Sequence, residues 1–227
     1  MHVHVVNSAN IHLYANEMDQ FFRIRHSIYA VDLKWVPESP SGRERDRFDT
    51  EKAVYLLGVV DGRVITGSRF IPTHLPHMLS EVFPHLCTRN GGVIASPHVA
   101  EWTRGFVVPE YREGLGVRLK ARFCHAVMEY FLDEGVVKIG GIQDISWLSL
   151  WKRFGWKVSI HGDAEDFNGR DWVPAYFDVT EDAAAGAARW GKLERSILVR
   201  KGSPGPFVSD VNSVPSSRID ASDDPEA

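Results

Sequence analysis

The sequence predicts a single α/β domain in which helices cover both faces of a mixed β-sheet, a three-layer αβα sandwich. Three observations favour this fold. A β-hairpin signature lies in the first half of the chain, helix-type and strand-type hydrophobic patterns alternate around it, and the length of 227 residues suits one domain. With 44% hydrophobic residues, the chain also has enough apolar side chains to form a core.

The hairpin signature is the clearest local pattern. Two runs rich in β-branched and aromatic residues, at 54–60 and 63–70, flank the pair Asp61-Gly62. An Asp-Gly pair between two such runs predicts a type I′ turn. This segment therefore supplies two antiparallel strands of the sheet.

The period of the hydrophobic residues predicts the remaining elements. Helical spacing occurs over residues 10–31, 76–86, 115–130, 146–154 and 181–200. Strand patterns occupy residues 3–6, 101–108, 136–142, 156–160 and 174–179, and the last of these is expected at the sheet edge. We assign residues 1–201 to the domain and expect residues 202–227, rich in Ser, Pro and Asp, to form a disordered tail.

Composition argues against several functional classes. A formal net charge of −4 gives no sign of nucleic-acid binding, and no apolar run is long enough for a membrane span. The N-terminus lacks a signal-peptide pattern, so the expected location is the cytoplasm. Cys87 and Cys124 give no disulfide framework. His98 and His125 show no ligand spacing, so no metal site is expected.

The stretch from Glu101 to Arg104 carries an acid, an indole and a guanidinium within four residues. Side chains alternate along a strand, so Glu101 and Thr103 would face one side and Trp102 and Arg104 the other, unless a bulge changes the alternation. Taken alone, the stretch fits an ordinary Glu–Arg surface pair beside a core tryptophan. Other polar residues give it a second interpretation.

The wider polar pattern resembles the LuxI-type autoinducer synthases, the acyl-homoserine lactone synthase family. The residues that carry it are Arg25, Trp35, Asp46 and Asp49 on either side of Phe48, Arg69, and Glu101 with Arg104 in Glu-x-x-Arg spacing. The match spans roughly residues 10–160. The resemblance implies a GNAT-like fold with a mixed, mostly antiparallel sheet, which agrees with the order of elements predicted above.

The sequence departs from the family pattern in two places. Tyr29 stands where the family usually has Phe, which only adds a hydroxyl. After Glu101, Thr103 stands where the family usually has Ser, and Gly105 is inserted before Phe106. The Glu-Trp-Thr-Arg form resembles the branch that uses acyl-CoA with short, branched or aryl acyl groups, such as the isovaleryl-homoserine lactone synthases.

The resemblance implies that the amine of S-adenosylmethionine attacks an acyl thioester. Its carboxylate then displaces methylthioadenosine and closes a lactone. S-adenosylmethionine and acyl-CoA would both be substrates, so no cofactor is expected. Acyl carrier protein remains open as an alternative donor. Such a carrier is acidic and would dock on a basic face of this protein. That face could be formed by Arg118, Lys120, Arg122, Lys152, Arg153 and Lys157, which could equally be a solvated helix surface.

Glu101 and Arg104 are the predicted catalytic residues. The substrate amine has to lose a proton before it attacks, because an α-amino group has a pKa of about 7.7–8.0. Glu101 could take that proton directly or through one water molecule. The alternative is that Glu101 only orients Arg104 or Arg25.

The other predicted residues divide between the two substrates. An arginine fork suits a carboxylate, and an aromatic face suits a sulfonium. The predicted S-adenosylmethionine-binding residues are Arg25, Tyr29, Trp35, Asp46, Asp49, Arg69, Arg104 and Phe106. The predicted acyl- and CoA-binding residues are Trp102, Thr103, Trp147, Arg112, Gly114 and Gly116. The indoles of Trp102 and Trp147 would leave room for a short or planar acyl group, whereas Trp151 and Trp156 are expected in the core.

Two other functions compete with this interpretation. One is a GNAT-like N-acyltransferase that does not form a lactone, and the other is a binding protein that senses S-adenosylmethionine or acyl-CoA. Trp35, Asp46 and Asp49 argue against the first, because a plain acetyltransferase needs no sulfonium site. The second is disfavoured because every polar position of the family pattern is filled.

Overall fold

The structure, a computed structural model, describes residues 1–113 and 116–208. The strands are β1 (His2–Val6), β2 (Val54–Val60), β3 (Arg63–Pro72), β4 (Val99–Val107), β5 (Lys138–Asp144), β6 (Val158–Ile160), β7 (Glu165–Asp166), β8 (Asp171–Asp178) and β9 (Leu198–Val199). The α-helices are α1 (Ala15–Arg25), α2 (Met78–Glu81), α3 (Gly116–Asp133), α4 (Leu148–Arg153) and α5 (Glu181–Gly191). No helix in these ranges has both the length and the apolar character needed to cross a bilayer.

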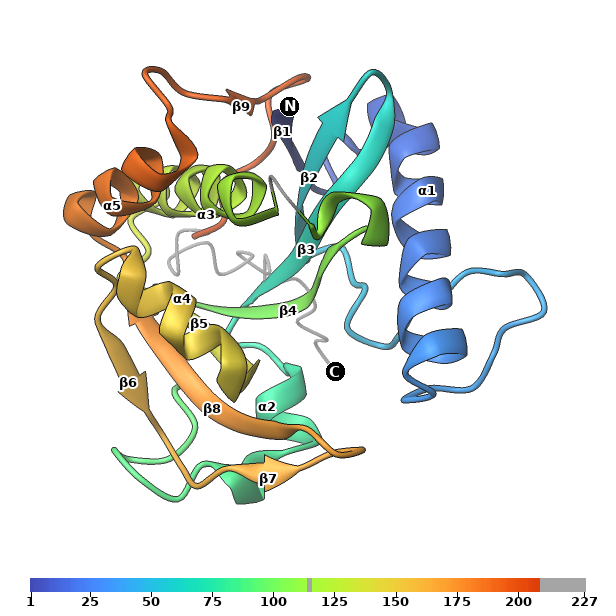
Figure 1. Cartoon of the computed structure of the whole chain (residues 1–227). Coiled ribbons are helices and arrows are strands. Elements are labelled where there is room, and N and C mark those ends of the chain that lie inside the picture. Colours follow the sequence, from blue (N-terminus) through green and yellow to red (C-terminus); the bar gives the residue numbers. More distant parts are fainter. Residues whose placement is uncertain (114–115, 209–227) are drawn as a thin grey trace, which may run out of the picture.

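The strands of the described chain form one mixed sheet in the order β6-β8-β5-β4-β3-β2-β1-β9, with β7 paired to β8. The pairs β4–β5 and β1–β9 are parallel, and the others are antiparallel. Figure 1 shows α1 on one side of the sheet and α3, α4 and α5 on the other. The three-layer sandwich and the mostly antiparallel sheet are therefore confirmed.

Two hydrophobic clusters fill the space on either side of the sheet. Along β2, Leu56 packs in the cluster that contains α3, whereas Tyr55 and Leu57 pack in the cluster that contains α1. This alternation is what a strand buried on both faces requires. The predicted hairpin is also confirmed, because Asp61 and Gly62 have φ angles of 48° and 75°, both positive as a type I′ turn needs.

The long helix predicted over residues 10–31 consists of three helical forms in succession. A 3₁₀ turn at Ile11–Tyr14 leads into α1, and a π-helix at His26–Asp32 follows. Trp35 N–H then donates to the Tyr29 carbonyl at 2.9 Å. π-Helical turns widen the backbone and often occur at functional sites. Here the turn positions Tyr29 and Trp35 for the site described below.

Three predicted elements differ in the structure. Strand β8 is internal rather than an edge strand, because β5, β6 and β7 all pair with it. The helix predicted over 76–86 divides into α2 and a 3₁₀ turn at Pro84–Leu86. The last helix ends at Gly191, where Lys192 adopts a left-handed conformation, and the chain continues into β9.

The sheet opens between β4 and β5. Their pairing consists of Val99 with Lys138, Ala100 with Ile139 and Glu101 with Gly140. At Gly141 the φ angle is +149°, and a Cβ there would lie 3.1 Å from the Trp102 carbonyl oxygen. Beyond Glu101 and Gly140, β4 and β5 continue without pairing to each other, and a gap in the sheet lies between them. The functional site lies in this gap.

The prediction of a disordered segment from residue 202 is wrong for residues 202–208. Phe207 is buried, its ring packs 5.0 Å from that of Phe131, and its N–H donates to Glu134 at 2.7 Å. Asn7 donates to the Gly205 carbonyl at 2.8 Å. The sequence gives no sign of this packing because its partners are remote along the chain. Residues 209–227 lie outside the described residues.

The side chain of Asn10 links this C-terminal segment to the N-terminus, and its removal should weaken the fold. The amide of Asn10 donates to the carbonyls of Val5 and Lys201 at 2.9 and 2.8 Å and accepts from the Asn7 N–H at 2.8 Å. We expect Asn10→Ala to lower the free energy of unfolding by about 2 kcal/mol, because it leaves buried polar groups unpaired. Urea unfolding measures this, with Asn16→Ala on the exposed face of α1 as the control. Equal unfolding midpoints for the two variants would contradict the prediction.

Candidate active site

A β-bulge in β4 determines which side chains meet. Arg69 on β3 pairs with Thr103, but Gly67 pairs with Phe106, so β4 has one residue more than β3 over this interval. Arg104 lies in the bulge with a φ angle of +55°. The bulge changes the alternation, and Arg104 joins Glu101 and Thr103 on the α1 side of the sheet. The simple alternation therefore fails at Arg104, whereas Trp102 faces the α3 side as predicted.

Three arginines and three carboxylates form a buried network on the α1 side. Arg25 donates through Nε to Glu44 at 2.5 Å and through both terminal nitrogens to Asp49 at 2.7 and 2.9 Å. Burial alone would lower the pKa of Arg25, but Asp49 and Glu44 raise it above its ordinary value. Arg25 is thus a buried ionic partner rather than a residue that complements a helix dipole.

The rest of the network centres on Asp46. Arg69 donates to both carboxylate oxygens of Asp46 at 2.5 and 3.1 Å, and the Arg104 Nη2 lies 2.8 Å from the same carboxylate. Burial would raise the pKa of Asp49, yet the Arg25 guanidinium, and after it the charge of Arg69, hold that pKa well below its usual range. The charges balance three to three, as buried ions need.

Glu44 is a functional residue that the sequence analysis missed. It bridges Arg25 and Arg104, which donates to its Oε1 through Nη2 at 3.1 Å. A charge count could have found it, since three buried arginines require three carboxylates and the pattern supplied only Asp46 and Asp49 from this loop. The loop from Arg43 to Asp49 is therefore structural support rather than a solvated linker.

An aromatic group lies beside the network. The Arg104 guanidinium lies 5.1 Å from the Tyr29 ring centroid, and the Tyr29 hydroxyl donates to the Gly105 carbonyl at 2.9 Å. Burial raises the pKa of Tyr29 to about 12 in spite of the nearby arginines, so the phenol stays neutral. The ring centroid of Trp35 lies 5.6 Å from that of Tyr29 and 4.9 Å from that of Trp172, which it meets edge-on. Trp172 comes from β8, and its role had no signal in the sequence.

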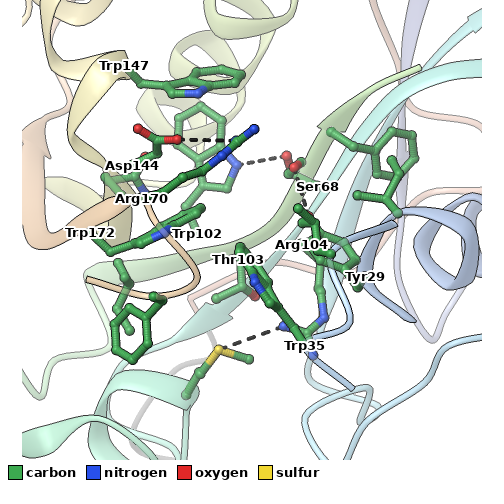
Figure 2. Close-up of a pocket in the computed structure, with 18 of the residues that line it drawn as sticks. Tyr29, Trp35, Ser68, Trp102, Thr103, Arg104, Asp144, Trp147, Arg170 and Trp172 are labelled. Atoms are coloured by element: carbon green, nitrogen blue, oxygen red, sulfur yellow. Dashed lines mark hydrogen bonds and ion pairs between the residues drawn. The ribbon is translucent and has the colours of Figure 1, made fainter. Parts of the chain in front are cut away.

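A cavity of about 930 Å³ occupies the gap between β4 and β5. Residues from both faces of the sheet line it, and Figure 2 shows Tyr29, Trp35 and Arg104 together with Trp102 and Trp147 around it. The predicted site residues that line it are Tyr29, Trp35, Asp46, Glu101, Trp102, Thr103, Arg104, Phe106, Arg112 and Trp147.

The other predicted site residues lie elsewhere. The side chains of Arg25, Asp49 and Arg69 are fully buried and do not line the cavity, so their predicted direct contact with a ligand is corrected to a supporting position. Gly116 is the first residue of α3, and its predicted partner Gly114 lies outside the described residues. Thr103, which does line the cavity, faces the arginine network rather than the apolar side, because its Oγ1 accepts from the Arg69 Nε at 3.2 Å.

Glu101 is buried where the charged half of the cavity, on the α1 side of the sheet, meets the apolar half on the α3 side. Its oxygens accept the N–H groups of Met78 and Leu79 at 2.9 and 2.6 Å, at the start of α2. Burial raises the pKa of Glu101, against a lowering influence of His77 and of the two amides. Within the described chain, no ion pair joins Glu101 to Arg25 or Arg104. The alternative that Glu101 orients those arginines by direct contact is therefore wrong.

The α3 side of the cavity is apolar and rich in indoles. Trp147 lies beneath the Lys120 ammonium, 4.5 Å from the ring centroid. Burial, and after it the charge of Arg112, lowers the pKa of Lys120. Trp151 and Trp156 stack at 5.0 Å inside the core as predicted, and Trp151 also reaches the cavity.

Two of the six basic residues considered as a docking face have other positions. Lys120 lines the cavity, and Arg122 donates to the Gly191 carbonyl at 2.8 Å. The sequence could not distinguish these positions, because the hydrophobic pattern does not show what each long basic side chain contacts. Within the residues that the structure describes, no three His, Cys, Asp or Glu side chains gather in a way that could hold a metal ion.

Comparison with known sequences relates this chain to one group of enzymes. The autoinducer synthase profile matches residues 9–184. The isovaleryl-homoserine lactone synthase of Bradyrhizobium diazoefficiens is 39% identical over 161 residues, which cover 70% of this chain and 72% of the relative. An acyl-homoserine-lactone synthase of Dickeya dadantii is 31% identical over 148 residues, 64% of this chain and 69% of that one.

Solved structures give the same relationship. The CoA-dependent acyl-homoserine lactone synthase BjaI, solved with SAM and isopentyl-CoA, matches with a TM-score of 0.84 at 32% identity, over 91% of this chain and 96% of that one. The CoA-dependent synthase MesI matches with a TM-score of 0.79 at 30% identity, over 87% and 98%. A putative N-acetyltransferase from Lactobacillus plantarum, at 11% identity and a TM-score of 0.51, shares only the fold, over 79% and 100%.

The homologous synthases identify the protein as an acyltransferase, and its αβ fold is shared with GNAT-like proteins. The chain belongs to the autoinducer synthase family, because the family profile covers most of the chain and the relatives above agree with it.

Proposed function

We propose that this protein is a quorum-sensing signal synthase that makes an N-acyl-L-homoserine lactone from S-adenosylmethionine and a short branched-chain or aryl acyl-CoA. The methionyl amine attacks the thioester carbonyl, and the CoA thiol leaves. The methionyl carboxylate then displaces methylthioadenosine from the γ-carbon and closes the lactone. The sulfonium is a good leaving group because it departs as a neutral thioether.

One observation carries the proposal. The cavity joins a charged half on the α1 side to an apolar half on the α3 side, at the point where β4 and β5 separate. The charged half suits a charged amino-acid sulfonium, and the apolar half suits an acyl chain. Past Glu101, the edge of β4 that faces β5 can offer backbone N–H groups to a thioester carbonyl at the junction.

The residues of the charged half have complementary roles. Arg104, the networked arginine that lines the cavity, would bind the methionyl carboxylate, since a guanidinium offers two parallel donors. Trp35 and Asp46 would face the sulfonium, through an aromatic ring and a negative charge. The residues that support these three are Arg25, Tyr29, Asp49, Arg69 and Phe106.

The apolar half would bind the acyl-CoA. Trp102 and Trp147 both line it, and Thr103 lies at the junction. Arg112 and the N-terminus of α3 at Gly116 would bind CoA phosphate groups, because a helix N-terminus favours anions. Glu101 would act as the base that deprotonates the methionyl amine.

Turnover with matched donors tests the proposal. With S-adenosylmethionine and isovaleryl-CoA, mass spectrometry should find methylthioadenosine and N-isovaleryl-homoserine lactone in equal amounts. Octanoyl-CoA should react more slowly by at least about tenfold, the scale at which pockets discriminate methylene groups. The same assay with cinnamoyl-CoA tests whether the protein uses aryl donors.

The other outcomes separate the competing functions. Product only from acyl carrier protein thioesters would keep the reaction but reject CoA as the donor. Acylation without release of methylthioadenosine would identify an N-acyltransferase that forms no lactone. Binding of S-adenosylmethionine without turnover on either carrier would identify a sensor protein.

A further inference from the structure

A buried hydrogen bond ties the indole of Trp102 to the neighbouring strand. The Trp102 Nε1 donates to the Ser68 Oγ at 2.7 Å, and both residues line the cavity. Ser68 is only 1% exposed and Trp102 only 8%. Figure 2 shows the bond as a dashed line between the indole and Ser68. A buried indole N–H is usually hydrogen-bonded, and this bond favours one orientation of the ring.

The bulge in β4 makes room for this bond. Ser68 lies opposite the extra residue, between the pairs Arg69–Thr103 and Gly67–Phe106. A Cβ at Gly105 would lie 3.2 Å from the Ser68 Oγ and 3.4 Å from the Trp102 Nε1. Gly105 is the glycine inserted relative to the usual family pattern. The insertion and the hydrogen bond therefore occur at the same place in the structure.

The Trp102 ring is also held by its other neighbours. Its ring packs 5.5 Å from Phe70, 5.8 Å from Trp151 and 6.4 Å from Trp156. Rings packed at this density move only if their neighbours move too. The hydrogen bond on one side and the aromatic contacts on the other make Trp102 a fixed wall of the apolar half.

We propose that Ser68 determines acyl-chain specificity by holding the Trp102 indole across the apolar half of the cavity. This inference rests on the proposed acyl transfer. Ser68 acts through Trp102 and is a positioning residue, because the indole forms the surface that an acyl chain would meet. Without the hydroxyl, the buried N–H is left unpaired at a cost in free energy, which favours ring orientations that reach another acceptor or water and so move the wall.

The ratio of kcat/KM for octanoyl-CoA to kcat/KM for isovaleryl-CoA measures this effect at saturating S-adenosylmethionine. We expect Ser68→Ala to raise that ratio by about tenfold, within the range by which hydrophobic pockets discriminate chain length. Trp102→Phe should raise it at least as much, because it removes the other partner of the same bond and also makes the wall smaller. The double variant should exceed Trp102→Phe by no more than about twofold, since Ser68 acts only through the Trp102 indole. The KM for S-adenosylmethionine should stay unchanged.

Thr66→Val is the matched control. The Thr66 hydroxyl is buried on the same strand and donates to the Phe106 carbonyl at 2.6 Å, so its removal breaks a hydrogen bond near the bulge while sparing Trp102. The specificity ratio of this variant should equal that of the wild type. Thermal unfolding checks that each variant is folded.

Hydrogen exchange of the Trp102 indole N–H gives a second readout that needs no turnover. The proton should exchange slowly in the wild type and faster by about tenfold or more in Ser68→Ala, because a buried hydrogen bond protects it. An unchanged specificity ratio in a folded Ser68→Ala variant would overturn the inference, as would unchanged exchange. Failure of the wild type to use any thioester would instead reject the proposed function, and the exchange result would still decide whether Ser68 holds the indole.

Discussion

Replacing Glu44 by Gln is expected to lower the free energy of unfolding by about 3–4 kcal/mol, because removing one partner of a buried ionic network leaves an uncompensated charge. Glu44 accepts hydrogen bonds from Arg25 and Arg104 and is itself buried. Gln keeps the shape but removes the charge. Urea unfolding at neutral pH measures the effect.

The same substitution should also weaken substrate binding. Arg104 would lose a partner that positions its guanidinium, so the KM for S-adenosylmethionine should rise by about tenfold or more, as expected when a charge-assisted contact is misplaced. The KM for acyl-CoA should change less, because the indole-lined half lies on the opposite face of the sheet.

Asp19→Asn provides a matched control for Glu44→Gln. Asp19 also accepts hydrogen bonds from two arginines, Arg23 at 2.7 Å and Arg43 at 2.5 Å, but it lies at the surface. Exposed ion pairs are screened by solvent and contribute little, so this variant should unfold at nearly the wild-type midpoint. Equal destabilisation by the two substitutions would show that burial does not set the strength of the Glu44 network.

The parts of the fold that the sequence could predict are those determined by short-range patterns. The Asp61-Gly62 turn and the helical stripe of α3 depend on residues within a few positions of one another, and both agree with the structure. The edge position predicted for β8 failed because strand order depends on pairing across the whole sheet. The packing of Phe207 failed for the same reason, since its partners lie far away in the sequence.

The same distinction between short-range pattern and long-range packing applies to the functional site. The family pattern gave residues such as Trp35 and Asp46, which line the cavity. It could not show that Arg25 lies behind the cavity wall, because burial is a property of the packed molecule. Ser68 had no signal either, since its role depends on a bulge in the neighbouring strand that alternation rules do not predict.

Glu101→Gln is expected to lower kcat/KM by about 10²–10⁴-fold, the usual contribution of a general base. Glu101 lines the cavity at the junction of its two halves, where the amine and the thioester would meet. Gln cannot accept the proton. It also offers one acceptor oxygen to the two N–H groups of Met78 and Leu79, so some loss of stability should accompany the loss of turnover.

The pH dependence separates catalysis from support of α2. Burial raises the pKa of Glu101, so the charged, proton-accepting form appears only as the pH rises through that raised value, and wild-type kcat/KM should increase with it. The folded protein binds this proton more tightly than the unfolded chain, so the free energy of unfolding should decrease over the same range. Both dependences on this group should be missing from Glu101→Gln.

Ser80→Ala is the control for the structural role of Glu101. The Ser80 hydroxyl accepts from the His77 N–H at 3.1 Å and donates to the His77 carbonyl at 3.0 Å, so its loss loosens the start of α2 while the carboxylate remains. This variant should keep the rise of kcat/KM with pH and lose little turnover. If Glu101→Gln also keeps that rise, with activity reduced only in proportion to the folded fraction, then Glu101 supports α2 and the base is another group.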